Sequence, residues 1–234
     1  MHKIISISGL IGSGKSTAAN FLVDNGFTSV AYADTLKDVV ALVFGWDRTL
    51  LEGDTYYSRV WRDSEDPWWT ANLDMDVIVT PRWALTHIGT EIMRNKFHKD
   101  VWLLCVKRRI SKIKGNIVIS DARFLNEIQL VRELGGTTIG IYRKIPSWLE
   151  KFYQKTDSHL LQGHLAQGLM EVDLRSSNNQ ELVIHAGVRA LDEVKQIHKV
   201  HPSEWTHLLW NDYAKIIDNT GTLNQLHDQL KEFL

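Results

Sequence analysis

Apolar residues along the 234-residue chain gather in short runs, and these runs alternate with stretches that have the period of an amphipathic helix. The first run, residues 3–8, precedes a helix-like stretch at 15–24. A second pair follows, with an apolar run at 28–34 and a helical pattern at 35–45 that stops at a glycine. Strands and helices in alternation predict a parallel sheet with helices on its faces.

The alternation is interrupted once and then resumes. Residues 46–80 are acidic and rich in tryptophan, and they lack a clear period, so we expect no regular element there. Further on, the pattern predicts helices at 82–97, 99–113 and 125–134 and strands at 116–121, 137–142 and 213–218. It also predicts a C-terminal helix with one apolar stripe, formed by Leu223, Leu226, Leu230 and Phe233.

These elements predict an α/β fold with a doubly wound parallel sheet of about five strands, flanked by helices, in a single domain spanning 1–234. The pattern weakens between 144 and 200. Because strand and helix resume afterwards, we expect 144–200 to be a helical insertion on this core and not a separate domain.

Composition narrows the class of protein. Hydrophobic residues make up 44% of the chain and charged residues 24%, an ordinary balance for a globular protein. The formal net charge of −1 gives no overall basic field that would attract nucleic acid. The single cysteine, Cys105, excludes an intramolecular disulfide and fits a reducing compartment. Without an apolar run near the ~18 residues of a membrane span, we expect a cytoplasmic protein.

The junction of the first predicted strand and helix carries the pattern G-x-x-x-x-G-K-[ST], filled by Gly9, Gly14, Lys15 and Ser16. Glycines let backbone N–H groups turn toward phosphate oxygens without a Cβ in the way. The helix that follows presents its positive N-terminus to the same anion. Lys15 can place a charge on the β- and γ-phosphates, and the Ser16 hydroxyl can ligate Mg²⁺. Because a strand precedes the pattern and a helix follows it, an incidental glycine turn is a poor alternative to a nucleotide site.

A second set of polar residues lies in 119–127, where a buried strand ends at Asp121. Parallel sheets bind ligands at their carboxyl edge, so Asp121 can hold Mg²⁺ or orient an acceptor. We expect Arg123 beside the phosphates and Glu127, one turn further, facing the acceptor. The alternative is a strand-end aspartate that caps the next helix beside an exposed arginine.

Two further segments offer contacts for an acceptor. Lys37 lies in the first turn of the helix expected at 35–45, where a cation is unfavourable for the helix dipole, and this suggests an anionic ligand nearby. The segment 80–102 mixes charged side chains with indoles, as a pocket for a phosphate and a flat base would. The alternatives are a solvated lysine and an amphipathic helix with ordinary salt bridges. The residues of the second segment are Arg82, Trp83, Glu91, Arg94 and Trp102.

Taken in order, these segments resemble the bacteriophage deoxynucleoside monophosphate kinases, a family of P-loop kinases. The resemblance covers most of the predicted core. It rests on the ordered set GLIGSGKST, ADTLKD, R…IGTE…R…W at 82–102, DARFLNE, HPSEW at 201–205 and IIDNTGTL at 216–223. The loop, ADTLK and DNTG are also similar to dephospho-coenzyme A kinases, which makes that family the nearest alternative.

The resemblance implies a role for individual residues of this chain. Those expected to hold ATP are Gly12, Gly14, Lys15, Ser16, Thr17, Ser203 and Asn219. Those expected to bind the acceptor are Leu36, Lys37, Arg82, Glu91, Arg94, Trp102 and Glu127. Those expected to act in catalysis are Lys15, Asp121 and Arg123, with Ser16 and Asp121 as the metal ligands.

The activity implied is phosphoryl transfer from ATP, with Mg²⁺, to a deoxynucleoside 5′-monophosphate. The product would be the diphosphate, for phage DNA precursor synthesis in the host cytoplasm. The partners expected are small-molecule nucleotides, with no membrane and no direct nucleic-acid contact, and a homodimer is left open. A kinase for dephospho-coenzyme A or another small metabolite is one alternative. A nucleotide-dependent DNA-binding or switch protein is another, opposed by the neutral charge and the lack of a DNA-reading module.

Two features of the sequence depart from the family pattern. Some members carry basic residues in the loop where this chain has Ile11 and Gly12, so the acceptor phosphate must be held by arginines elsewhere. The insertion 144–200 lies where related kinases have a lid that closes over the phosphates. Arg143 at its start or Arg175 within it would then reach the transition state, while 46–98 would form the acceptor region.

Overall fold

The computed structural model describes residues 2–143 and 213–234. The chain divides into two compact units, one made of Met1–Val30 with Ile113–Leu234 and the other of Ala31–Lys112. The insertion predicted at 144–200, together with Arg175 and Ser203, lies outside the described residues.

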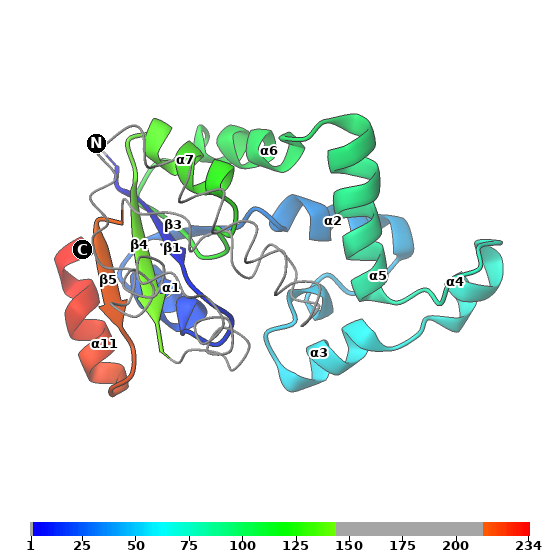
Figure 1. Cartoon of the computed structure of the whole chain (residues 1–234), viewed down its shortest axis with the longest axis horizontal. Helices are drawn as coiled ribbons and strands as arrows, with labels where there is room; N and C mark the ends of the chain where they lie inside the picture. The colour runs from blue at the N-terminus through cyan, green and yellow to red at the C-terminus, as the bar shows by residue number, and fades with distance from the viewer. Residues whose placement is uncertain (1, 144–212) are drawn as a thin grey trace, which may run out of the picture. The chain divides into compact units, whose positions relative to one another are not determined.

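The first unit is built on a five-stranded sheet in which every neighbouring pair of strands is parallel (Figure 1). The strand order is β2-β3-β1-β4-β5, so β1 lies in the middle. This confirms the predicted doubly wound parallel sheet. The strands are β1 (Ile4–Ser8), β2 (Thr28–Val30), β3 (Ile117–Ile119), β4 (Thr137–Tyr142) and β5 (Lys215–Asp218).

All five residues of β1 are buried, because helices cover both faces of the sheet. One face packs Ile5 and Ile7 against α1 (Lys15–Asp24) and α11 (Leu223–Leu230), which lie side by side (Figure 1). The other face contacts α7 (Leu125–Glu133). Side chains alternate along a strand, so the two serines of β1 face α7 and not the isoleucine-rich core.

The second unit is helical. Its small core contains Val40, Leu51 and Ala84, with partly buried tryptophans packed around them. The helices are α2 (Asp34–Phe44), η1 (Leu50–Glu52), α3 (Tyr56–Asp63), α4 (Pro67–Asn72), α5 (Pro81–Thr86), the π-helical η2 (His87–Phe97) and α6 (Val101–Ile110).

The expectation that 46–80 has no regular elements is wrong, because this stretch contains three short helices. Local signals define them. The Thr55 hydroxyl accepts from the Ser58 N–H at the start of α3, and the Asp66 carboxylate caps α4, where Pro67 is the first residue. Helices of six to eight residues are too short to show a clear hydrophobic period.

Two smaller expectations are also corrected. β2 ends at Val30, not at residue 34, and α2 begins at Asp34. Within α11, Leu226 and Leu230 are buried, whereas Leu223 is 53% exposed and does not belong to the core stripe. The last turn is the short helix η5 (Lys231–Phe233). None of the described helices has the length and apolarity needed to cross a bilayer.

Candidate active site

The loop between β1 and α1 has a backbone that only glycine allows at two positions. Gly9 has φ +157°, and a Cβ there would lie 2.2 Å from the carbonyl oxygen of Ile141 on β4. Gly14 has φ +101°, and its Cβ would lie 2.2 Å from the side-chain nitrogen of Asn219. A Ser13 N–H bond to Leu10 O, at 3.2 Å, closes the turn between them. The glycines of the motif are therefore required by close approach as well as by φ.

Lys15 turns back over the same loop. Its Nζ donates to Gly9 O at 2.8 Å and to Leu10 O at 2.7 Å. The loop carbonyls thus hold the ammonium group next to the glycines. Ser16 and Thr17, which follow in the first turn of α1, are exposed. This places a cation and two hydroxyls around the start of one helix.

The N-terminus of α1 offers its N–H groups to a ligand. Gly14 is the N-cap and has no side chain to accept their hydrogen bonds, and the first turn contains no acidic residue. Unsatisfied N–H groups and the helix dipole both favour a bound anion. Together with Lys15, they give this end of the helix the chemistry of a phosphate site.

The loop after β3 lies beside this site. β3 pairs with β1, so the segments that follow the two strands emerge next to each other at the carboxyl edge of the sheet. The buried Ser8 hydroxyl donates to Ala122 O at 3.0 Å and so joins the two segments directly. The structure therefore brings Asp121 and Arg123, the residues on either side of Ala122, close to the glycine loop.

Glu127 has a well-defined structural contact. Its side chain is buried, and its Oε2 accepts from the backbone N–H of Arg123 at 2.8 Å and of Phe124 at 3.1 Å. Glu127 is the N3 residue of α7, so its carboxylate caps this helix and fixes residues 123–124. The alternative considered from the sequence was a cap from Asp121, whereas Glu127 caps this helix.

Asn219 follows β5 and also reaches the glycine loop. It is 8% exposed, and its Nδ2 donates to Ser13 O at 2.8 Å. On the neighbouring strands, Tyr142 forms a hydrogen bond with Asp218. Burial raises the pKa of Tyr142 most, and this bond raises it further. The Asn219 amide therefore supports the backbone of the glycine loop, and its contact with ATP stays a prediction.

The remaining acceptor candidates belong to the second unit. Lys37 Nζ pairs with Glu52 Oε2 at 2.6 Å. Partial burial raises the pKa of Glu52, but hydrogen bonds from Lys37 and Arg48 outweigh it and hold this pKa below its usual value. Glu52 thus supplies negative charge beside Lys37, which weakens the suggestion of an anionic ligand there, and the role of Lys37 toward an acceptor stays a prediction. Sequence could not show this partner, which lies in the stretch expected to be irregular.

Arg82 and Trp102 also have partners in the second unit. Arg82 Nη2 donates to Asp63 Oδ2 at 3.0 Å, and this hydrogen-bonded pair lowers the pKa of Asp63 and raises that of Arg82. Both side chains are about half exposed. Trp102 is 3% exposed, and its Nε1 donates to Gly89 O at 3.0 Å inside η2. The indole is therefore part of the core of this unit, and its contact with an acceptor stays a prediction.

The other candidates lie on α2 and η2. Glu91 Oε2 accepts from Asn95 at 3.0 Å, and Arg94 is partly buried on the same helix. Leu36 packs against the core of the unit and contacts the face of η2 where Gly89 has no side chain. The tight fit at Gly89 explains why a glycine occupies this helix interior.

The donors available for a metal suit magnesium. Ser16 offers an exposed hydroxyl, and Asp121 offers a carboxylate in the adjoining segment. Hard oxygen donors in small number fit Mg²⁺, which keeps several waters and is shared with phosphates. Among residues 2–143 and 213–234, no three His, Cys, Asp or Glu side chains converge as a dedicated cage would require.

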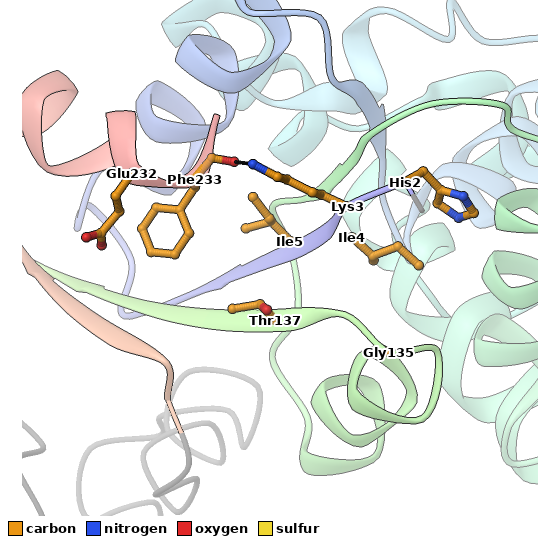
Figure 2. Close-up of a pocket in the computed structure, with 8 residues that line it drawn as sticks. All are labelled: His2, Lys3, Ile4, Ile5, Gly135, Thr137, Glu232 and Phe233. Atoms are coloured by element: carbon orange, nitrogen blue, oxygen red, sulfur yellow. Dashed lines mark hydrogen bonds between the residues drawn. The ribbon is translucent and has the colours of Figure 1, made fainter.

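A separate pocket lies at the other end of the sheet. Its volume is about 370 Å³. Figure 2 shows residues that line it, which include Lys3 just before β1, Thr137 at the start of β4, and Glu232 and Phe233. The amino ends of these strands form it, whereas the glycine loop follows the carboxyl end of β1. This cavity is therefore not part of the candidate active site.

A glycine loop that follows the central strand of a five-stranded parallel sheet and runs into α1 defines the P-loop class of nucleotide-binding proteins. Comparison with known proteins narrows the class. Over 153 residues, 60% of this chain and 74% of the relative, the chain is 31% identical to a protein of Acanthamoeba polyphaga mimivirus named as a deoxynucleotide monophosphate kinase. The chain belongs to this kinase family, and it is a phosphotransferase that acts on nucleotides.

A second relative points to the same family. Over 58 residues, 24% of this chain and 23% of the relative, the chain is 38% identical to the deoxynucleoside-5′-monophosphate kinase of Escherichia phage T5. No family model matches the chain. Among solved structures, dephospho-CoA kinase from Campylobacter jejuni aligns with 99% of this chain and 95% of its own, at 16% identity and a TM-score of 0.42. Shikimate kinase from Acinetobacter baumannii aligns with 100% of this chain and 91% of its own, at 12% identity and a TM-score of 0.39.

Proposed function

We propose that the chain transfers the γ-phosphoryl group of ATP to a deoxynucleoside 5′-monophosphate, giving the diphosphate, a precursor for DNA synthesis. The observation that carries this proposal is the junction of two segments. The glycine loop and the Asp121–Arg123 segment are tied together by the Ser8–Ala122 hydrogen bond. Phosphoryl transfer needs a donor cradle with cationic and carboxylate groups beside it, and these two segments supply both.

On the donor side, the loop residues act together. Gly12 and Gly14 keep the backbone free of side chains, and Lys15 leaves its carbonyl partners to contact the β- and γ-phosphates. The Ser16 and Thr17 hydroxyls donate to phosphate oxygens. Lys15 has the largest effect on the rate, because its cation stabilises charge that builds up on the transferred group.

On the reacting side, Arg123 neutralises charge on the transferred phosphoryl group, and Asp121 orients the acceptor oxygen. The Glu127 cap keeps the backbone of Arg123 in one place, since it accepts from that residue's N–H. Positioning and charge neutralisation then suffice, and no covalent enzyme intermediate is needed. A Mg²⁺ ion held by Ser16 and Asp121 would add charge neutralisation between the phosphates.

The acceptor phosphate requires cations from outside the loop. Between Gly9 and Thr17 the loop contains one basic residue, Lys15, and the exposed position 11 is an isoleucine. We assign the acceptor contacts to the second unit, with its arginines on the phosphate and the other side chains on the nucleoside. These are Leu36, Lys37, Arg82, Glu91, Arg94 and Trp102.

A panel of acceptors tests the proposal. The protein is incubated with ATP and Mg²⁺ and one of dGMP, dTMP, dCMP, dAMP or dephospho-coenzyme A, and the nucleotides are separated and quantified. We expect a deoxynucleoside diphosphate from at least one monophosphate. Phosphorylation of dephospho-coenzyme A alone would replace the proposed substrate. Salt-dependent binding of DNA without any monophosphate turnover would support a DNA-binding or switch protein instead.

A further inference from the structure

β1 carries two buried hydroxyls, Ser6 and Ser8, on the face that does not pack against α1. The Ser6 hydroxyl is paired with that of Thr138 at 2.8 Å, across the neighbouring strand. Ser8, two residues on, is fully buried and donates to Ala122 O at 3.0 Å. Serines in the central strand of a parallel sheet are unusual, because such strands are normally apolar throughout. This makes their contacts worth following.

Ser8 has a second partner, the side chain of Tyr213, with which it forms a hydrogen bond. Tyr213 lies just before β5, and its ring lies over Gly140 of β4, where a Cβ would be 3.4 Å from the ring. Gly140 is the register partner of Ser8. The tyrosine is only partly buried as a whole, but protein surrounds its phenol group, and this burial raises the pKa of the phenol.

The direction of these bonds follows from the number of protons. A serine hydroxyl has one proton to donate, and the Ala122 carbonyl can only accept. The Ser8 proton is therefore engaged at Ala122 O, and Tyr213 must donate its own proton to Ser8 Oγ. A tyrosine is protonated at neutral pH even at its ordinary pKa of about 10, so the Tyr213 phenol has a proton to donate. The Ser8 hydroxyl thus accepts one hydrogen bond and donates another, and two such bonds strengthen each other by polarisation.

The two hydrogen bonds end at Ala122, beside the residues proposed to act in the reaction. Ala122 lies between Asp121 and Arg123, and Ser8 directly precedes Gly9, whose carbonyl accepts from Lys15. One buried oxygen therefore sits where the phosphate loop begins and where the Asp121–Arg123 segment is fastened. A shift of this oxygen changes the distance between the donor cradle and the residues proposed to act on the phosphoryl group.

We propose that Ser8 and Tyr213 are positioning residues, and that the relay Tyr213 O–H to Ser8 O–H to Ala122 C=O sets the Asp121–Arg123 segment against the phosphate loop. The effect on turnover rests on the proposed function, whereas the effect on the loop does not. Ser8 and Tyr213 do not touch the substrate in this account. They act through the backbone of Ala122.

The test compares three variants of the full chain. Ser8→Ala removes both bonds, and Tyr213→Phe removes one hydroxyl while keeping the ring over Gly140. Ser6→Ala is the matched control, because it deletes a buried serine hydroxyl from the same face of the same strand without touching Ala122. Hydrogen exchange of the amides at 121–124 and steady-state kinetics with ATP and a deoxynucleoside monophosphate are measured for each.

We expect Ser8→Ala to speed amide exchange at 121–124 about tenfold, and Tyr213→Phe to speed it about threefold, while Ser6→Ala leaves it unchanged. The same order should appear in kcat, with about a tenfold loss for Ser8→Ala and KM for ATP within about twofold of the wild type. A merely structural role would lower stability in Ser8→Ala and Ser6→Ala alike, without this split between kcat and KM.

Exchange at 121–124 that rises no more in Ser8→Ala than in Ser6→Ala would overturn the relay. If Ser8→Ala does not fold, unchanged exchange at 121–124 in Tyr213→Phe has the same consequence. Faster exchange with an unchanged kcat would overturn the positioning of the reaction. A wild-type protein that phosphorylates no monophosphate would instead refute the proposed function, and the exchange data would still decide whether the relay holds the segment.

Discussion

The Asn219 side chain donates from Nδ2 to the Ser13 carbonyl of the glycine loop at 2.8 Å, joining residues 206 positions apart. Gly14 packs closely against this amide, because a Cβ there would lie 2.2 Å from the same nitrogen. Asn219, which follows β5, therefore supports the glycine loop at Ser13 and Gly14. We therefore expect Asn219 to affect binding of ATP through the backbone of the loop.

Replacing Asn219 with Ala tests this support. The substitution leaves a buried carbonyl without its partner, so we expect the free energy of unfolding to fall by about 1–2 kcal/mol. It should also raise KM for ATP about tenfold, because the loop is less well ordered before binding. Gln229→Ala is the control, since Gln229 Nε2 donates to the neighbouring Asp218 O at 2.8 Å but has no bond to the loop. Equal effects of the two variants on KM would contradict the support.

Variants at Arg82 and Asp63 distinguish binding of the acceptor phosphate by the arginine from its ion pair with Asp63. If Arg82 binds the acceptor phosphate, Arg82→Ala should raise KM for the monophosphate about tenfold or more and leave KM for ATP nearly unchanged. Asp63→Asn removes the ion pair but keeps the arginine. Because both side chains are about half exposed, this change should cost at most about 1 kcal/mol of stability and leave KM for the monophosphate near the wild-type value.

The Glu52 carboxylate gives stability a defined dependence on pH. The pKa of Glu52 is lowered from its usual value of 4.5, so its contribution is fully present above about pH 4.5 and is lost as the pH falls through the folded-state pKa. We therefore expect wild type to be more stable than Glu52→Gln at pH 7, by no more than about 1 kcal/mol because the site is partly exposed. The difference should shrink below pH 4.5, as measured by urea unfolding between pH 3 and 7. A difference that grows on acidification would contradict the contact with Lys37 and Arg48.

The sequence predicted most of the sheet because β1, β3 and β4 contain buried apolar residues in short runs. The sequence also predicted that the loop with Lys15 and the Asp121 segment lie close together, because parallel strands bring their carboxyl ends to one edge of the sheet. What the sequence did not reveal depends on contacts between distant positions. The Ser8–Ala122 and Lys37–Glu52 contacts are of this kind.

The short helices of the second unit were missed for a different reason. Their hydrophobic period is too short to detect, but their starts are marked by a capping residue followed by proline, at Asp66-Pro67 and Thr80-Pro81. Reading these pairs as helix starts would have predicted α4 and placed the start of α5, whose helix was expected from residue 82. Trp46, Trp61 and Trp83 are partly buried and pack against the core of this unit, where the ring of Phe44 stacks on Trp46.

The most direct test of the account measures transfer of labelled γ-phosphate from ATP to a deoxynucleoside monophosphate by wild type, Lys15→Ala and Lys3→Ala. Lys3 is the matched control, because its ammonium also donates to a backbone carbonyl, that of Phe233 at 3.1 Å, but at the opposite edge of the sheet. With each variant shown to be folded by its unfolding transition, we expect labelled diphosphate from wild type and Lys3→Ala. Lys15→Ala should be slower by at least about 100-fold. Turnover of Lys15→Ala within a few-fold of wild type would contradict the assignment of the glycine loop as the donor site.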